Sequence, residues 1–156
     1  MYTQTSNNDP YYYLPFQNNE KNFYYLFTTN MLVDKPDKER TIKEYFNIIY
    51  HDGHFLKAIE ELMKKYDSYS YDGCYGYYPD LNSIYQNDHF EEGLVRFSIG
   101  LDEEYYRVYV SEREFFKYAK EACLRFLELH PNHHLFIMNI LDNWKPKYPD
   151  KFPEQT

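Results

Sequence analysis

Hydrophobic and polar residues alternate in two short stretches in the second half of the chain. Every second position is apolar at Val95, Phe97 and Ile99, and again at Tyr106, Val108 and Val110. A repeat of two residues predicts strands that each have one apolar face. The intervening segment, Gly100 to Glu104, contains one glycine and three acidic residues and has the length of a hairpin loop. The pattern therefore predicts a central β-hairpin.

A long amphipathic helix is predicted directly after the second strand. Ser111 and Glu114 have the spacing of a capping box, in which each side chain bonds the backbone N–H of the other residue. Apolar residues then recur at helical spacing at Phe115, Phe116, Ala119, Ala122, Cys123, Phe126 and Leu127. The helix should end at His130, because a residue that precedes a proline disfavours helical backbone angles.

Three further helices are predicted from the same periodicity. The first follows Lys35-Pro36-Asp37 and ends near Gly53, which is a favourable C-terminal cap. Its apolar stripe consists of Ile42, Tyr45, Phe46, Ile49 and Tyr50. The second helix, from Phe55 to Tyr66, follows so closely that the pair should form a helical hairpin or a kinked rod. A shorter helix spans Asn132 to Trp144.

Together these elements predict an α+β fold, with a small antiparallel sheet built on the central hairpin and packed against several amphipathic helices. We expect one domain, residues 1–156. Residues 1–20 are polar and interrupted by prolines, which predicts a mobile N-terminal arm with its aromatic run 11–16 docked on the domain. Residues 22–33 fit a helix or a strand, and their aromatic residues favour a strand. The proline-rich tail, residues 145–156, should wrap the surface or fray.

The segment from Asp67 to Phe90 differs from the rest of the chain. Six tyrosines are interleaved with four aspartates, and two glycines and a proline interrupt any long element. The segment is too aromatic for a solvated linker and too broken for a core helix. We expect part of it to add a strand to the sheet of the hairpin.

Composition and charge narrow the classes of function. The chain has 20 tyrosines, a residue type that closes hydrophobic cores and is also enriched at protein interfaces. Part of this excess also fits the codon bias of an AT-rich gene. A formal net charge of −8 argues against a nucleic-acid partner, whose phosphates attract lysine and arginine, and suits a basic protein partner. The alternative is that the charge only keeps the protein soluble.

Cysteine use and the absence of long apolar runs predict a cytoplasmic protein with no membrane partner. Cys74 and Cys123 are too few for a disulfide framework, and the second lies on the apolar face of the long helix. The N-terminus lacks the basic start and apolar run of a signal peptide, and no stretch of about 18 apolar residues occurs.

Candidate catalytic chemistry is sparse. His130, His133 and His134 lie close together in the sequence and could form the zinc site of a small metal-dependent hydrolase. However, Pro131 interrupts the group, and histidines at helix ends commonly complement the helix dipole. No glycine-rich phosphate loop occurs, and no positional cue pairs a nucleophile with a base. We therefore predict no cofactor and no enzymatic activity, with the hydrolase as the alternative.

A family resemblance rests on YRVYVSEREFFKYAKEACLRFLELHP and on the preceding cysteine-containing segment YDGCYGYY. In these features the chain resembles the immunity proteins of contact-dependent growth-inhibition systems, above all the CdiI-type group that blocks ribonuclease toxins. The resemblance covers Asp67 to Leu141, whereas the first forty residues carry no matching feature. It implies that the chain binds a toxin nuclease domain, the C-terminal domain of a CdiA-type protein, in a 1:1 complex in the cytoplasm. A ribonuclease of the EndoU type is the expected toxin.

The resemblance and the residue pattern together indicate where such a partner would bind. A nuclease that holds phosphates has a cationic surface, which acidic side chains attract and aromatic side chains anchor. The expected toxin-binding surface consists of Tyr69, Tyr71, Asp72, Tyr75, Tyr77, Tyr78, Asp80, Asp88, Glu91, Glu92, Asp102, Glu103 and Glu104. The alternative for any one of these tyrosines is that it packs beneath the N-terminal arm. The expected mechanism is occlusion of the toxin's active site, without turnover.

Overall fold

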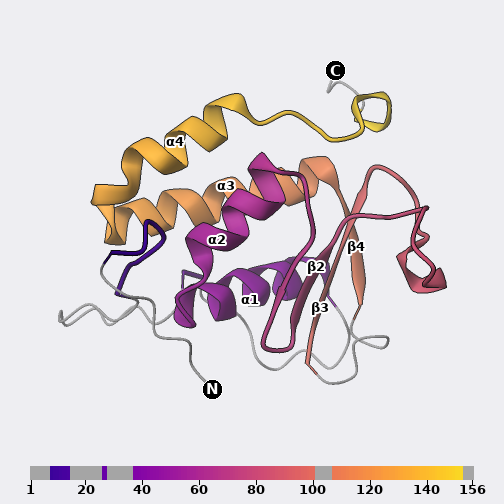
Figure 1. The fold of residues 1–156 in the computed structure, drawn as a ribbon, viewed down its shortest axis with the longest axis horizontal. Coiled ribbons are helices and arrows are strands. Elements are labelled where there is room, and N and C mark those ends of the chain that lie inside the picture. The colour runs from indigo at the N-terminus through magenta and orange to yellow at the C-terminus, as the bar shows by residue number, and fades with distance from the viewer. Residues whose placement is uncertain (1–7, 15–25, 28–36, 101–106, 153–156) are drawn as a thin grey trace.

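The computed structural model describes residues 8–14, 26–27, 37–100 and 107–152, and within these ranges it has the α+β fold that the sequence predicts. The strands are β1 (Tyr69–Tyr71), β2 (Cys74–Tyr77), β3 (Leu94–Ile99) and β4 (Val108–Ser111). They form one sheet in the order β1-β2-β3-β4, and each strand is antiparallel to its neighbours. Figure 1 shows the sheet beside the layered helices.

The helices agree with the predicted ones in number and position. They are α1 (Lys38–His51), α2 (Phe55–Ile59), α3 (Glu112–Leu129) and α4 (His134–Asn143), with short 3₁₀ turns η2 (Gln86–Asp88), η3 (Pro131–His133) and η4 (Pro149–Lys151). One feature was not predicted: α2 continues into a π-helical turn, η1 (Glu60–Lys64). The periodicity of apolar residues locates a helix but does not distinguish α from π winding.

Two predicted helix boundaries, the start of α3 and the end of α1, are confirmed by their hydrogen bonds. The capping box is present at α3, where the Glu114 N–H donates to Ser111 Oγ and the Ser111 N–H donates to Glu114 Oε1, each at 3.1 Å. At the end of α1, Gly53 has a φ of +83° and its N–H bonds the Tyr50 carbonyl. The His54 N–H bonds the Ile49 carbonyl at 2.9 Å, which completes the arrangement known as a Schellman motif.

The predicted central hairpin is formed by β3 and β4. Val95 pairs with Val110 and Phe97 pairs with Val108, and all four side chains are buried on one face of the sheet. The expected acidic loop between these strands falls on residues 101–106, which lie outside the described part of the chain.

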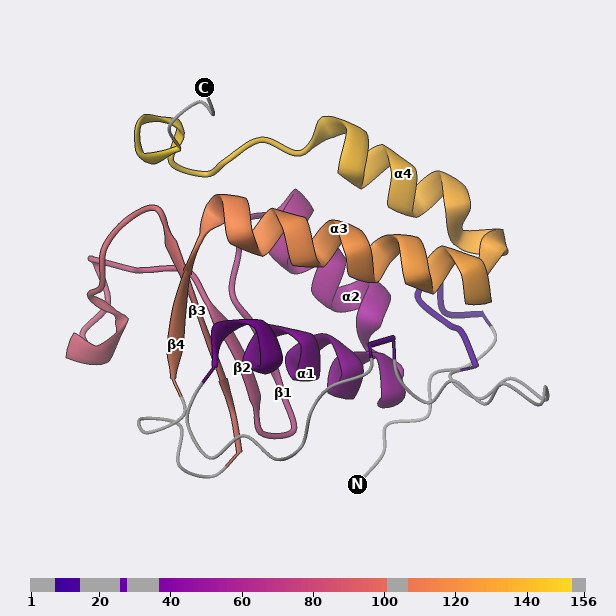
Figure 2. The same ribbon diagram turned by 180° about the vertical axis from the view of Figure 1, so that it is seen from behind.

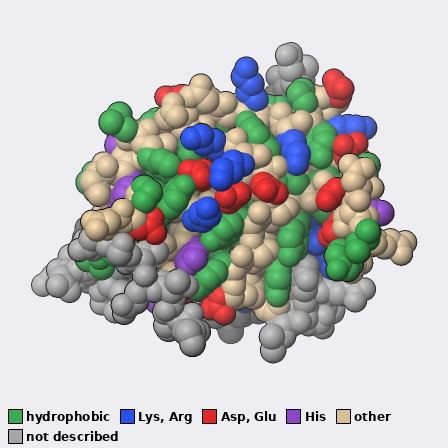
Figure 3. All heavy atoms as spheres, viewed as in Figure 1, with side chains coloured by type: hydrophobic (Ala, Val, Ile, Leu, Met, Phe, Trp, Pro, Cys, Tyr) green, Lys and Arg blue, Asp and Glu red, His purple; other side chains and the backbone are tan. Residues whose placement is uncertain are grey.

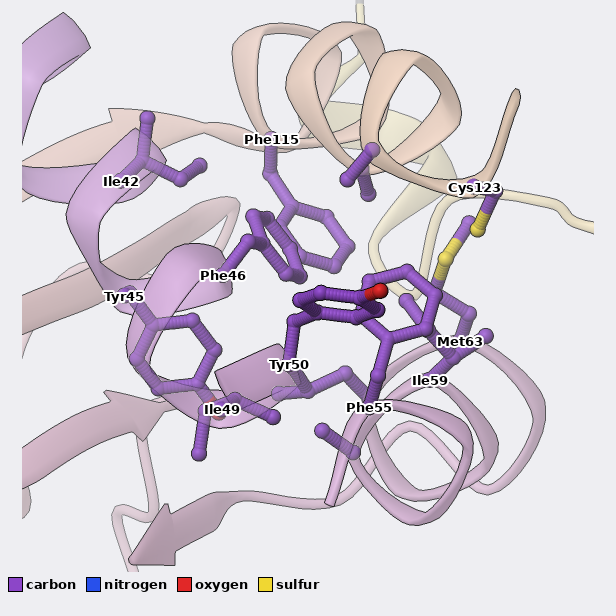
Figure 4. Close-up of a cluster of buried hydrophobic side chains, with 14 of the residues drawn as sticks. Ile42, Tyr45, Phe46, Ile49, Tyr50, Phe55, Ile59, Met63, Phe115 and Cys123 are labelled. Carbon is purple, nitrogen blue, oxygen red and sulfur yellow. The ribbon is translucent and has the colours of Figure 1, made fainter. Parts of the chain in front are cut away.

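The hydrophobic core lies between this face of the sheet and the helices. Both α1 and α3 pack on β3 and β4, and α4 packs on α3 and η1. Figures 1 and 2 show α4 on the far side of α3 from α1. In the core, side chains of α1, α2 and α3 point into one cluster, with the Tyr50 ring near its centre (Figure 4).

A glycine in β2 allows α1 to approach the sheet closely. A Cβ atom at Gly76 would lie 3.1 Å from the Tyr45 hydroxyl and 3.1 Å from the Phe97 ring. Tyr45 is fully buried, and its hydroxyl donates a hydrogen bond of 2.8 Å to the Tyr69 carbonyl in the outer strand β1. The glycine therefore makes room for the contact that joins α1 to β1.

Both chain ends are held by specific contacts where they are described. Glu112, only 2% exposed, accepts hydrogen bonds from the backbone N–H groups of Lys147 and Tyr148 and so holds the tail along the surface. Near the N-terminus, Tyr13 is buried against Tyr50, with ring centroids 5.3 Å apart. The Tyr13 hydroxyl donates to the Tyr50 carbonyl at 2.6 Å and accepts from the Phe55 N–H at 3.1 Å.

Only two residues of the predicted strand at 22–33 fall in the described ranges. Leu26 and Phe27 are buried at a bend, and the remainder of that prediction lies outside the described residues. The Asn47 side chain bonds both backbone groups of Phe27, at 2.8 Å to its N–H and 3.0 Å to its carbonyl. This pair of bonds fixes the position of the bend against α1.

The contacts of Tyr13 predict that the N-terminal arm contributes to stability. Replacing Tyr13 with Phe removes the hydroxyl that accepts from the buried Phe55 N–H and donates one of two hydrogen bonds to the Tyr50 carbonyl, so the free energy of unfolding should fall by about 1–3 kcal/mol. Tyr12→Phe, at the partly exposed neighbour, is the matched control and should change stability by less than about 0.5 kcal/mol. Urea denaturation of both variants measures the difference, and equal stabilities would contradict the proposed role of the hydroxyl.

Candidate functional site

The tyrosine-rich segment adds two strands, a second hairpin, to the sheet, where the sequence predicted one added strand. Strands β1 and β2 are joined by Asp72 and Gly73 alone, whose φ values are +49° and +79°. Positive φ at both central residues defines a type I′ turn, which matches the twist of the flanking strands. The turn fixes the register of the hairpin, with Tyr71 opposite Cys74 and Tyr69 opposite Gly76.

This register places Tyr69 and Tyr71 on the face of the sheet that the helices cover. The Tyr69 hydroxyl lies 2.7 Å from Nδ1 of His54, and burial raises the pKa of Tyr69 to about 12. The Tyr71 ring stacks on the His54 ring with centroids 3.7 Å apart. Tyr78, just after β2, is buried and donates its hydroxyl to the Leu62 carbonyl at 2.7 Å. Tyr78 is therefore buried, and Tyr69 and Tyr71 are half-buried side chains that pack against the core.

Tyr75 and Tyr77 lie on the opposite face of the sheet. Both are partly exposed, and their ring centroids are 6.2 Å apart. Arg96 of β3 lies opposite Tyr77 in the sheet, and only 2% of its surface is exposed. Its guanidinium carbon lies 4.9 Å from the centroid of Tyr77 and 5.1 Å from that of Phe90, so the cation is enclosed by two aromatic rings.

The chain between β2 and β3 forms a loop that is closed by its own hydrogen bonds. We call residues Asp80–Asp88 the β2–β3 loop. The Asp80 N–H donates to the Asp88 carbonyl at 2.8 Å, which joins the two ends. The Ser83 hydroxyl donates to Asp88 Oδ2 at 2.6 Å, and the Asn82 N–H donates to Asp80 Oδ1 at 3.0 Å. Such a compact segment with adjacent ends is an Ω-loop.

Arg96 also attaches this loop to the sheet, because its side chain donates a hydrogen bond to the Asn87 carbonyl. Figures 1 and 2 both show the loop projecting at the end of the molecule, beyond the strands and away from α4. A buried cation therefore links the sheet to a projecting surface element.

The loop exposes three large apolar side chains among its polar ones, a feature that was not predicted from the sequence. Leu81, Ile84 and Tyr85 are 56%, 89% and 68% exposed, and we call these three residues the apolar tip. Large hydrophobic side chains this exposed, and this close together in sequence, are typical of binding sites. Large apolar residues among the turn-forming aspartates, asparagine and serine of 80–88 were a signal in the sequence.

The acidic residues of the predicted surface fall into three groups. Asp72, Asp80, Glu91 and Glu92 are exposed, and Asp88 is partly buried within the loop. Asp102, Glu103 and Glu104 lie outside the described residues. Figure 3 shows acidic and hydrophobic side chains beside each other at the end of the molecule where Figure 1 places the loop. We call Glu91 and Glu92, which follow the loop, the acidic rim.

The histidines that suggested a metal site have different surroundings in the fold, and two of them contact other groups of the chain. His130 is 5% exposed and its Nε2 lies 2.9 Å from the Tyr50 hydroxyl, while His133 Nε2 lies 3.1 Å from the Tyr12 carbonyl. His134 is exposed at the start of α4. Within the described part of the chain, no three His, Cys, Asp or Glu side chains form a group that would hold a metal ion. The alternative hydrolase thus gains no support from the geometry.

Comparison with known proteins identifies one relationship. A family model described as CDI immunity protein matches residues 38–141, which is two thirds of the chain. A comparison with curated proteins found no match. The matched range contains all four strands of the sheet, the β2–β3 loop and the acidic rim. None of the helices in the described ranges is sufficiently long and apolar to span a membrane.

The buried environment of His130 predicts a pH dependence of stability. Burial lowers the pKa of His130 in the folded state from 6.5 to about 4, with a smaller contribution from His133. As the pH falls, the unfolded state binds this proton before the folded state does. The stabilisation from neutral His130 is therefore fully present above pH 6.5 and is lost as the pH approaches 4. The part of this loss due to His130 should be about 3 kcal/mol.

The measurement is urea denaturation between pH 7 and pH 4 for the wild type and for His130→Phe. The substitution removes the titrating group, and the pH dependence should become shallower by the stated amount. An unchanged pH dependence in the variant would contradict a buried, neutral His130.

Proposed function

Because the chain belongs to the CDI immunity protein family, we propose that it protects its own cell by binding a cognate toxin nuclease domain in the cytoplasm. Family membership supplies the immunity function and implies a toxin partner. The proposal adds that the toxin is a ribonuclease of the EndoU type, and that one copy of the chain binds one toxin domain. The chain would act by covering the toxin's active site and would carry out no reaction itself.

The observation that carries this proposal is the grouping of acidic and aromatic side chains at one end of the sheet. The proposed toxin-binding surface consists of the β2–β3 loop, the acidic rim, Tyr75 and Tyr77. Tyr69, Tyr71 and Tyr78 are left out, because their hydroxyl groups or rings are engaged inside the fold. The loop at 101–106 stays a prediction from the sequence alone.

Charge complementarity supports a nuclease as the partner. A nuclease active site must attract phosphate groups and is therefore cationic, whereas this chain has a formal net charge of −8. Exposed carboxylates at the rim would increase the rate of encounter with such a surface. A bound chain at that position would exclude RNA by competing for the same cationic site.

The proposal is tested by inhibition of the toxin. We expect the cognate toxin domain to be encoded immediately upstream of this gene, and its cleavage of total bacterial RNA is measured with increasing amounts of this chain. Cleavage should stop near one equivalent of the chain, and the same domain should leave DNA intact. Full RNA cleavage in the presence of a tenfold excess would contradict the immunity function, whereas cleavage of DNA alone would contradict only the ribonuclease class.

The acidic rim predicts a specific kinetic effect. Glu91→Lys together with Glu92→Lys should lower the association rate with the toxin domain by about tenfold at low ionic strength, because attraction to a cationic surface is replaced by repulsion. The difference from the wild type should shrink at about 0.5 M salt, where screening is strong.

A matched control changes the net charge equally elsewhere. Glu128→Lys together with Asp142→Lys alters two exposed acids on α3 and α4, away from the loop. Stopped-flow fluorescence at several salt concentrations gives the association rates of the two double variants. Equal slowing in both would mean that the rim has no special position relative to the toxin.

A further inference from the structure

On the basis of the proposed function, we infer that the apolar tip of the β2–β3 loop holds the toxin once it has bound, by entering an apolar pocket bordered by cationic residues. The acidic rim then governs encounter, and the tip governs retention. The toxin's binding site should therefore contain apolar residues in addition to the cationic residues with which a nuclease binds phosphate.

The apolar tip is exposed to solvent in the free protein. Ile84 is 89% exposed in a chain whose other isoleucines in the described ranges are buried or partly buried. Burying one isoleucine or tyrosine in a partner is among the largest favourable contributions that a single side chain can make. Leu81 and Tyr85, close to Ile84 in the sequence and also exposed, would add apolar area to such a contact.

Internal hydrogen bonds hold the loop in one conformation before the toxin binds. The bond from the Asp80 N–H to the Asp88 carbonyl closes the loop, and the Ser83 hydroxyl bridges its interior by bonding Asp88 Oδ2. The Tyr85 N–H donates to Ser83 Oγ at 3.1 Å, which positions the tip itself. A surface that is already ordered loses less conformational entropy on binding, so its apolar contacts are retained as affinity.

The acidic residues of the loop form hydrogen bonds within the loop itself. Asp80 Oδ1 accepts from the Asn82 N–H, and Asp88 Oδ2 accepts from the Ser83 hydroxyl, so both carboxylates serve the internal structure. Arg96, enclosed by Tyr77 and Phe90, fixes the same loop to β3. Asp80 and Asp88, which the sequence predicted as direct toxin contacts, are therefore positioning residues for the apolar tip.

The charge around the tip indicates which kind of protein binds it. The tip is followed along the chain by the exposed Glu91 and Glu92, and the whole chain is strongly acidic. Two copies that met through this end would bring like charges together, which disfavours a dimer through the tip. A basic partner with an apolar hollow satisfies both features, and a toxin nuclease domain supplies the basic surface.

The experiment compares two equally exposed apolar residues. Ile84→Asp places a charge at the tip, and Leu135→Asp places the same charge on α4, where Leu135 is 84% exposed. Both side chains lie in water, so neither substitution should lower the melting temperature, which is checked first. Dissociation of each variant from the immobilised upstream toxin domain is then measured by surface plasmon resonance.

Ile84→Asp should dissociate at least about tenfold faster than the wild type with little change in association rate, and Leu135→Asp should match the wild type. If the wild type binds and Ile84→Asp dissociates at the same rate, the tip does not hold the toxin, and the immunity function is unaffected. If both variants dissociate equally fast, the effect is not specific to the tip, which also overturns the inference. If the wild type itself does not bind, the proposed function fails.

Discussion

The burial of one face of the sheet against α1 and α3 determines where every other part of the surface lies. Val95 and Phe97 of β3 are fully buried beneath these helices, and the alternation of side chains along each strand then assigns every neighbour to one face or the other. In β1 this alternation turns the tyrosines toward the helices, and in β2 it turns Tyr75 and Tyr77 away from them. Tyrosines that lie close together in the sequence are thereby divided between the two faces of the sheet.

Local sequence signals predicted the elements whose structure is decided locally. The capping residues and apolar periodicity of α1 and α3 determine both helices, because each helix needs only its own ends and one buried face. The division of the tyrosines depends on the register of β1 and β2, and Asp72-Gly73, a strong signal for a two-residue turn, would have supplied it. Exposure of Ile84 was not predictable in the same way, since it depends on where Arg96 and the sheet hold the loop.

The β2–β3 loop shows how a surface element can be both apolar and well ordered. Asp80, Ser83 and Asp88 form hydrogen bonds within the loop, while the large apolar side chains of Leu81, Ile84 and Tyr85 are exposed. Exposed apolar side chains are unusual in a folded chain. The guanidinium of Arg96, enclosed by two aromatic rings, holds the loop in position by joining it to β3. In an immunity protein such a loop fits a role in which recognition must be fast and release must be slow.

The location of the toxin on this chain is tested most directly by amide hydrogen exchange, comparing the free protein with its complex with the upstream toxin domain. Binding at the end of the sheet predicts slower exchange in residues 80–92 and at Tyr75 and Tyr77, with α4 unchanged. Slower exchange confined to α4 and the N-terminal arm, with residues 80–92 exchanging as in the free protein, would contradict the proposed surface.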